Sequence, residues 1–168
     1  MTDTETAPQA PKPAPIPEEA KRTLSGLEQV RAIRDGKLGV APMQALMNMR
    51  LIEAEEGKVV FVGIPEEKHY NPGGSVHGAF TAAMLDSAMG LAVVSTLPPN
   101  VGNTTIEFKL NLVRPMFAST GEVRAEGWVL HRGRTIATAE GRLFDAAGKL
   151  IAHGTTTVMI FPSTHKGS

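Results

Sequence analysis

The sequence predicts an α+β domain in which a curved antiparallel sheet wraps around one long central helix. Residues 76–94 are rich in Ala, Met and Leu and contain no proline, which favours a helix that is apolar nearly all round and therefore buried. Two strand-like runs precede this segment and four follow it. Because short turns join the last three runs, we expect them to form an antiparallel meander that packs on the helix.

The first 23 residues are not expected to fold. They mix Ala, Pro, Thr and Glu, and five of the 12 prolines of the chain fall within them. A segment of this composition buries too little apolar surface to offset the entropy that is lost on ordering. We therefore expect a disordered Pro/Ala-rich arm at residues 1–23, one domain at residues 24–162 and a flexible tail at residues 163–168.

Ordered structure is expected to begin with a short amphipathic helix. Ser25 is a candidate N-cap, Glu28 follows three residues later, and Gly36 and Gly39 are candidate stops. The apolar residues near helical spacing are Leu27, Val30, Ile33 and Leu38. Residues 47–54 and 58–64 are strand-like and flank the turn sequence Glu55-Glu56-Gly57, which predicts a hairpin.

Four strands are expected after the long helix, at residues 104–113, 122–131, 135–144 and 150–160. In the first of them, apolar and polar residues alternate, which is typical of a strand with one buried face. The apolar set is Ile106, Phe108, Leu110 and Leu112, and the polar set is Thr105, Glu107, Lys109 and Asn111. We expect the apolar set to form the buried face.

The composition disfavours several classes of protein. The 168 residues include 17 Lys and Arg against 17 Asp and Glu, and this zero net charge argues against general binding to nucleic acids or anionic membranes. Without cysteine, the chain has no disulfide, thiol nucleophile or thiolate metal site.

The longest apolar stretch, at residues 79–94, is shorter than the roughly 20 residues that span a bilayer. The N-terminus lacks the pattern of a signal peptide, so we expect a cytoplasmic protein.

One carboxylate on the predicted helix is a candidate catalytic group. Asp86 lies among Ala, Met and Leu residues that offer no charge partner, and burying an ionised carboxylate is costly unless it is partnered or functional. The alternative is a structural carboxylate that accepts hydrogen bonds from backbone or hydroxyl groups. A polar, glycine-rich stretch at residues 69–78 leads into the same helix and favours the functional interpretation.

The first turn of that helix offers a complementary group. Backbone N–H groups near Gly78 and Ala79 lack an intrahelical acceptor and lie at the positive end of the helix dipole. They can therefore polarise a carbonyl and hold an oxyanion. The alternative is that Gly78 is only a small residue that packing requires.

The spacing of these groups predicts a dimer. Gly78 and Asp86 are eight residues apart, about 12 Å along a helix axis, which is too far for both to contact one carbonyl group. Two such helices packed antiparallel about a two-fold axis near Ala82 bring Gly78 of one chain level with Asp86 of the other. Two equivalent sites result.

Several motifs occur together and in an order that is specific. They are Asn71-Pro72-x-Gly-x-Val-His77-Gly78, the helix sequence Leu85-Asp86-Ser87-Ala88-Met89-Gly90, Arg114-Pro115, and the turn His131-Arg132-Gly133-Arg134. From about residue 24 to residue 160, the chain closely resembles hotdog-fold acyl-CoA thioesterases of the phenylacetate-pathway (PaaI-like) type. The resemblance implies hydrolysis of an acyl-CoA thioester without a metal or other cofactor, at the interface of a homodimer or a dimer of dimers.

The resemblance also implies roles for individual residues. Asp86 matches the carboxylate that acts as nucleophile or as general base toward water, and Gly78 matches the backbone donor to the thioester carbonyl. Asn71 matches a loop amide that positions the reacting water or carbonyl. Thr104 matches a hydroxyl position that assists in some members. His77 looks like a residue that shapes the site or makes hydrogen bonds, and not like the base.

One position departs from the family pattern. A second glycine usually follows His-Gly, and Ala79 stands there in this chain. Its methyl group leaves the N–H in place but reduces the room for the acyl group. An apolar wall that includes Phe80 favours medium-chain or aryl-acyl substrates. Arg114, Arg132 and Arg134 either hold CoA phosphates or are solvated turn residues.

Three other interpretations stay open. His69, His77 and Asp86 offer metal-ligand atoms, although their spacing matches no standard motif. A hotdog enoyl-CoA hydratase or dehydratase is a second enzyme class. A non-catalytic dimer that binds acyl-CoA is a third interpretation, in which Asp86 is structural.

Overall fold

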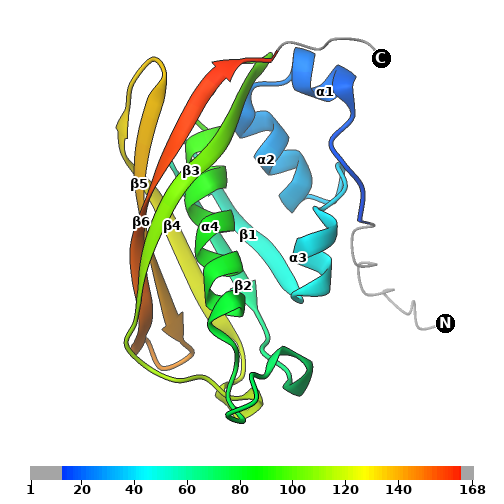
Figure 1. Cartoon of the computed structure of the whole chain (residues 1–168). Helices are drawn as coiled ribbons and strands as arrows, with labels where there is room; N and C mark the ends of the chain where they lie inside the picture. Colours follow the sequence, from blue (N-terminus) through cyan, green and yellow to red (C-terminus); the bar gives the residue numbers. More distant parts are fainter. Residues whose placement is uncertain (1–12, 164–168) are drawn as a thin grey trace, which may run out of the picture.

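Six antiparallel strands form one sheet that curves around a long helix, as Figure 1 shows for the computed structural model, which describes residues 13–163. The strand order across the sheet is β1-β2-β4-β5-β6-β3. The strands are β1 (Met49–Glu55), β2 (Lys58–Gly63), β3 (Val101–Leu112), β4 (Val123–Arg132), β5 (Ile136–Asp145) and β6 (Leu150–Pro162). The predicted fold class, the β1–β2 hairpin and the β4–β5–β6 meander are confirmed.

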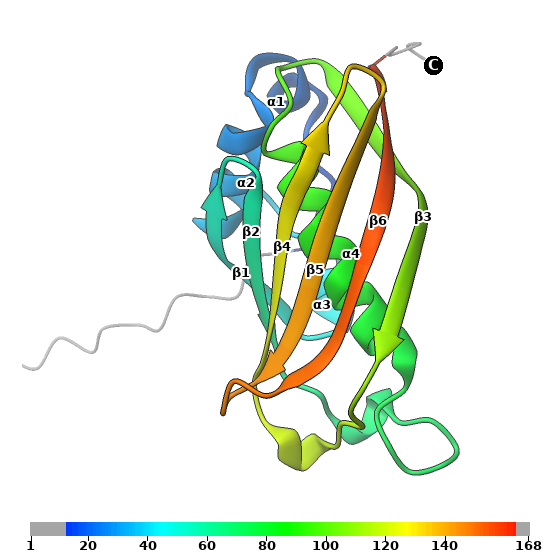
Figure 2. The same cartoon turned by 90° about the vertical axis from the view of Figure 1, so that its left-hand side faces the viewer.

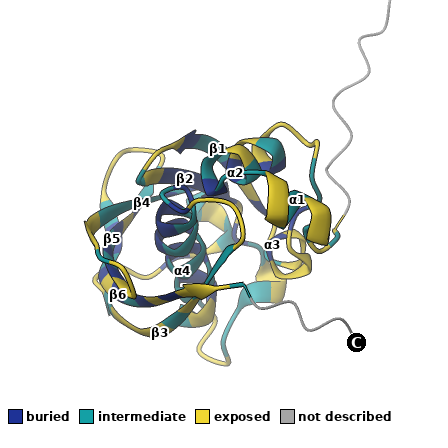
Figure 3. Cartoon of the chain, turned by 90° about the horizontal axis from the view of Figure 1, so that it is seen from above, coloured by how far each residue is buried: buried dark blue, intermediate teal, exposed yellow. Residues whose placement is uncertain are grey.

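The long helix α4 (Gly78–Val94) lies inside the curve of the sheet, as the view from above in Figure 3 shows. Its buried residues are Phe80, Thr81, Met84, Leu85, Ala88, Met89, Ala92 and Val93. The helix approaches β4 closely because Gly127 has no side chain: a Cβ there would lie 2.4 Å from the carbonyl carbon of Ala88. The predicted single buried helix is confirmed, and it begins two residues later than expected.

The C-terminal end of α4 is tied to the β1–β2 hairpin. Gly57, with φ +75°, lies in the hairpin turn, and its N–H donates a hydrogen bond of 2.8 Å to Oγ of Ser95. The same hydroxyl donates to the carbonyl oxygen of Ala92 over 2.7 Å. These two bonds anchor the helix along its axis, so they help to place Asp86 relative to the sheet.

Three short helices precede the sheet in the described chain: α1 (Glu18–Thr23), α2 (Gly26–Arg34) and α3 (Pro42–Leu46). The predicted first helix is α2, and Ser25 and Glu28 form its capping box as expected. The sequence did not predict α3, because five residues are too few to display a helical period. α2 packs against β1, and α3 lies near the same strand.

The expected disorder of residues 1–23 is wrong for the part that the structure describes. Pro13 forms a parallel bridge with Val40, and α1 follows. Acidic residues in the first turn of α1 and basic residues in its last turn complement the helix dipole. The carbonyl oxygen of Lys21 accepts a hydrogen bond of 2.9 Å from the N–H of Asn100, which ties α1 to the start of β3. The expectations for residues 1–12 and 164–168 fall outside the described residues.

The predicted burial of the apolar face of β3 is also wrong within one chain. Ile106, Phe108 and Leu112 are 55%, 42% and 55% exposed. Figure 2 shows that β3 is the edge strand next to β6, and the exposed fractions show that α4 leaves these three side chains largely uncovered. No helix within residues 13–163 combines the length and the apolar character needed to cross a membrane.

Candidate active site

One side of α4 is only half-buried. It consists of Ala82, Ala83, Asp86, Ser87, Gly90, Leu91 and Val94, and we call it the open stripe. These positions recur every three or four residues and therefore share one face of the helix. The exposed inner face of β3 lies beside the stripe, and Asp86 is the one ionisable residue on it. A carboxylate thus sits in the middle of an apolar surface that a single chain leaves open.

Asp86 is held by a hydroxyl group from the edge strand. Its Oδ1 accepts a hydrogen bond of 2.9 Å from Oγ1 of Thr105. Its Oδ2 has no hydrogen-bond partner among residues 13–163. The hydrogen bond to Oδ1 therefore orients the carboxylate, and Oδ2 is free to take a proton or to attack a carbon atom.

The threonine that contacts Asp86 is Thr105, and not Thr104, at which an assisting hydroxyl was predicted. Thr104 is exposed and pairs with Met159 on the outer face of the sheet, whereas Thr105 pairs with the buried Val158 on the inner face. The regular alternation assumed from the sequence places Thr104 on the inner face. A β-bulge at Ile106 shifts the alternation by one residue and turns Thr105 inward instead.

The N-terminus of α4 offers one free donor. His77 is the N-cap, and its Nδ1 accepts the N–H of Ala79 over 3.0 Å. Because Nδ1 is an acceptor here, the neutral ring carries its proton on Nε2. The N–H of Gly78 meets no acceptor in the described part of the chain. The donor expected at Gly78 is therefore available, and the donor at Ala79 is already used.

Asn71 organises the loop that leads into α4. Its Oδ1 accepts the N–H of Gly73 over 2.8 Å, and its Nδ2 donates to Oγ of Ser75 over 3.1 Å. The neighbouring Tyr70, for which no role was predicted from the sequence, accepts the N–H of Ala118 at its hydroxyl over 2.8 Å. Both side chains shape the loop between η1 (Glu67–His69) and α4, and the amide of Asn71 is engaged by its own loop.

The two predicted acyl-binding residues have different surroundings. Ala79 is exposed in the first turn of α4. Phe80 is 1% exposed, and its ring centroid lies 4.8 Å from that of His69. Phe80 is therefore a core residue in one chain, and its predicted place on an open pocket wall is wrong for this structure.

The three predicted phosphate-binding arginines lie at two ends of the sheet. Arg114 follows β3, and its Nε donates to the carbonyl oxygen of Leu150 at the start of β6 over 3.1 Å. Arg132 and Arg134 lie at the β4–β5 turn, beside the other end of β6. A strand of 13 residues spans about 40 Å. One chain therefore does not bring Arg114 together with the other two.

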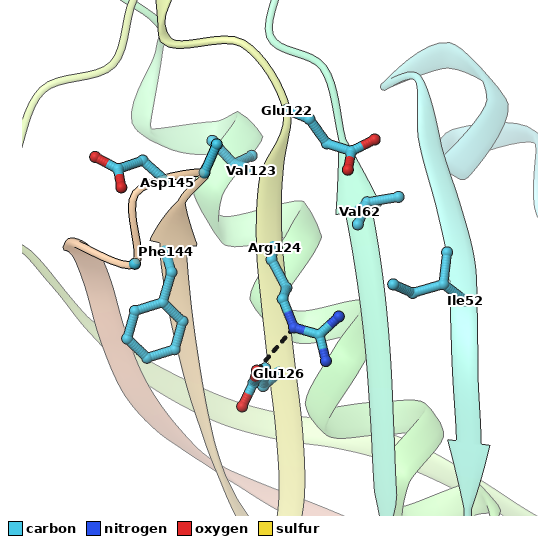
Figure 4. Close-up of a pocket in the computed structure, with 10 residues that line it drawn as sticks. Ile52, Val62, Glu122, Val123, Arg124, Glu126, Phe144 and Asp145 are labelled. Carbon is cyan, nitrogen blue, oxygen red and sulfur yellow. Dashed lines mark hydrogen bonds and ion pairs between the residues drawn. The ribbon is translucent and has the colours of Figure 1, made fainter.

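A hollow lies on the outer face of the sheet, over β1, β2, β4 and β5 (Figure 4). Arg124 lines it and pairs with the carboxylates of Glu126 at 2.8 Å and Glu53 at 2.7 Å. These hydrogen bonds raise the pKa of Arg124 above its usual range. The cation is thus neutralised within the chain. The hollow lies across the sheet from Asp86, so it is not part of the candidate active site.

The histidines near the helix entry do not form a metal site. Within residues 13–163, no three His, Asp or Glu side chains lie close enough together to hold a metal ion. His69 accepts the N–H of Glu66 at Nδ1 over 3.0 Å, and Nδ1 of His77 is used by Ala79. Each ring is therefore oriented by a backbone donor of its own loop.

Comparisons with known proteins show the family and support the fold. Residues 73–152 match the family model described as "Thioesterase superfamily". Acyl-coenzyme A thioesterase 13 of Homo sapiens is 32% identical over 116 residues, which are 68% of this chain and 81% of that protein. A phenylacetic acid degradation-related protein of Ralstonia eutropha JMP134 superposes with a TM-score of 0.71 at 26% identity, covering 77% of this chain and 98% of that one. A variant of the phenylacetic acid degradation protein PaaI of Thermus thermophilus gives a TM-score of 0.64 at 27% identity, covering 70% and 97%.

Proposed function

Because this chain belongs to the thioesterase superfamily, we propose that it is a thioester hydrolase whose substrate is an acyl-CoA with a medium-chain or aryl-acyl group. The products are the free acid and CoA. The main support is the placement of Asp86, a carboxylate on the open stripe that is oriented by Thr105 and has one oxygen free. The names of the relatives, which refer to acyl-coenzyme A and to phenylacetic acid, support the substrate class.

Asp86 and Gly78 have complementary roles in the proposed reaction. Asp86 either attacks the thioester carbonyl carbon or removes a proton from the water that attacks it. Charge develops on the carbonyl oxygen, and the free N–H of Gly78 at the positive end of α4 stabilises it. The C–S bond then breaks and CoA leaves as the thiolate. If Asp86 acts as the base, the proton that it took from the attacking water passes to the sulfur. If Asp86 acts as the nucleophile, a water molecule next hydrolyses the acyl-Asp86 anhydride, which releases the free acid, restores the carboxylate and supplies the proton for the sulfur.

The two groups come from different chains of a dimer in this proposal. Within one helix they are about 12 Å apart, which one carbonyl group does not span. The open stripe contains small residues, and a Cβ added at Gly90 would meet nothing within 4 Å, so a second helix has room to approach. The edge strand β3 adds unpaired backbone groups and exposed apolar side chains, which a second copy of the chain would cover.

An antiparallel dimer also explains the separation of the arginines. The two-fold axis reverses the ends of the second sheet, so Arg114 of one chain comes to the same end as Arg132 and Arg134 of the other. The predicted phosphate-binding group is then composite. Guanidinium groups suit the phosphates of CoA because they donate paired hydrogen bonds to oxygen atoms.

Release of free thiol from a panel of acyl-CoA compounds tests the activity. Asp86→Asn should retain acyl-CoA binding and lower turnover by about a hundredfold or more. Asp145→Asn is the matched control, because that carboxylate accepts two N–H groups in the β5–β6 turn, and it should turn over normally. Normal turnover by Asp86→Asn would contradict the mechanism. Binding without thiol release by the wild type would favour the non-catalytic interpretation.

A further inference from the structure

The β-bulge in β3 decides which threonine faces Asp86. From Leu112 back to Phe108, alternate residues of β3 pair with inward-facing residues of β6. Ile106 has no partner, and Thr105 then pairs with Val158 on the inner face. A regular strand would turn Thr104 inward and Thr105 outward, because successive side chains alternate between faces. The hydrogen bond from Thr105 to Asp86 therefore depends on the bulge.

Two threonines of β6 hold the residue next to the bulge from both faces of the sheet. Oγ1 of Thr156, which is 1% exposed on the inner face, donates to the carbonyl oxygen of Glu107 over 2.8 Å. Oγ1 of Thr157, on the outer face, donates to Oε1 of Glu107 over 2.6 Å. Glu107 is thus bound through its main chain and its side chain. Its place opposite Thr157 fixes where the regular ladder stops and the bulge begins.

The hydroxyl of Thr157 has a hydrogen-bond partner on the outer face, whereas the hydroxyl of Thr155 on the same face has none within residues 13–163. Thr155 lies two residues earlier on the same face of β6 and pairs with Lys109 in the regular part of the ladder. Its side chain makes no hydrogen bond to the described residues, whereas Thr157 and Glu107 make a short charge-assisted one beside the bulge. Bulges beside active sites commonly re-aim a side chain.

We propose that Glu107 and Thr157 are positioning residues that lock the bulge at Ile106 and thereby hold the hydroxyl of Thr105 on Asp86. This role rests on the proposed function, because it concerns the same carboxylate. Neither residue touches the substrate, since their side chains lie on the outer face of the sheet, across from α4. A bond on the solvent side of the sheet thus controls the geometry of a group on the inner side.

The test is a double-mutant cycle between Thr157→Val and Thr105→Val, measured as kcat and KM for acyl-CoA hydrolysis. Thr157→Val should lower kcat by about tenfold with KM unchanged, since small misplacements of catalytic groups are costly. It should have no further effect in the Thr105→Val background, because both substitutions remove the same interaction. Thr157→Ser should restore kcat, and Thr155→Val is the control with normal kcat.

A spectroscopic measurement tests the positioning without relying on turnover. In protein with labelled threonine methyl groups, Thr157→Val should shift the NMR signal of Thr105, and Thr155→Val should leave it in place. An unchanged Thr105 signal, or losses in kcat that add in the double variant, would overturn the positioning role. If the wild type releases no thiol from any acyl-CoA, the proposed function fails, and the methyl signal still decides whether Thr157 controls Thr105.

Discussion

The hydroxyl of Thr105 donates a hydrogen bond of 2.9 Å to Oδ1 of Asp86, which joins the edge strand β3 to the middle of α4. The bond joins the edge strand to a helix that also packs on β2, β4, β5 and β6. It leaves the second oxygen of Asp86 without a partner among the described residues. The carboxylate is thus oriented and still available for chemistry, which a purely structural carboxylate with both oxygens bound would not be.

Removal of the Thr105 hydroxyl should therefore slow catalysis. Thr105→Val keeps the size and the strand preference of the side chain, and we expect kcat to fall by about tenfold to a hundredfold because Asp86 loses its orientation. Thr104→Val is the matched control on the outer face and should retain normal kcat. Steady-state kinetics on both variants decides between the two threonines. A greater loss for Thr104→Val would mean that the bulge is placed differently in the active protein.

The contrast between Thr104 and Thr105 shows which features of β3 can be predicted from the sequence and which cannot. The alternation over residues 104–113 correctly predicts a strand, because apolar and polar residues have a period of two. A bulge adds one residue without disturbing the local composition, so the pattern does not reveal that the faces exchange at Ile106. The hydroxyl of Thr156 binds the carbonyl oxygen of Glu107 beside the bulge, and the two residues are 49 positions apart in the sequence. Such long-range contacts leave no local signature.

The same contrast between local and long-range contacts separates the other elements that were predicted from those that were missed. The capping box at Ser25 and the turn at Gly57 depend on neighbours in sequence, and both were predicted. The helix α1 was missed, because its contact from Lys21 to Asn100 is distant in sequence. The apolar residues of β3 were expected to be buried, and in one chain most of them are exposed. Within one chain nothing covers Phe108, and in our proposal a second copy does so.

Gly78→Pro isolates the contribution of one N–H group. Gly78 is the first residue of α4, a position where proline is favoured, and His77 before it already has the extended backbone that proline requires. A Cβ there would lie 3.6 Å from Leu112, an ordinary contact. The variant should fold and lose about a hundredfold to a thousandfold in kcat, the usual effect of removing an oxyanion donor. Gly78→Ala keeps the N–H and should lose much less. Equal kcat for both variants would show that this N–H does not contact the substrate.

Mixed dimers test whether the two groups act across the interface. Chains with Gly78→Pro and chains with Asp86→Asn should each be inactive alone. After subunit exchange, activity should return to about a quarter of the wild-type value, because half of random dimers are mixed and one of their two sites is intact. Native mass spectrometry of differently tagged chains should confirm that exchange has occurred. No recovery in exchanged samples would place both groups in one protomer's site and contradict the proposed geometry.

Ala79→Gly tests the position that departs from the family pattern. Ala79 is exposed in the first turn of α4, next to the free N–H of Gly78, while its own N–H is held by His77. Its methyl group should hinder acyl groups that are branched or carry a ring close to the carbonyl more than straight chains. The substitution should therefore raise kcat/KM for bulky substrates relative to straight ones. The corresponding difference in transition-state binding free energy should be about 1–3 kcal/mol at most, the range for one methylene group.

The same substitution should lower the free energy of unfolding by up to about 1 kcal/mol, because glycine is the poorer helix former. Denaturant unfolding measures this cost, and kinetics with one bulky and one straight acyl-CoA measures the selectivity. Since the His77 cap binds the backbone and not the methyl group, it should persist in Ala79→Gly and leave the N–H of Gly78 in place. A ratio of kcat/KM values equal to that of the wild type would mean that the methyl group faces away from the acyl group, and that another residue sets the acyl preference.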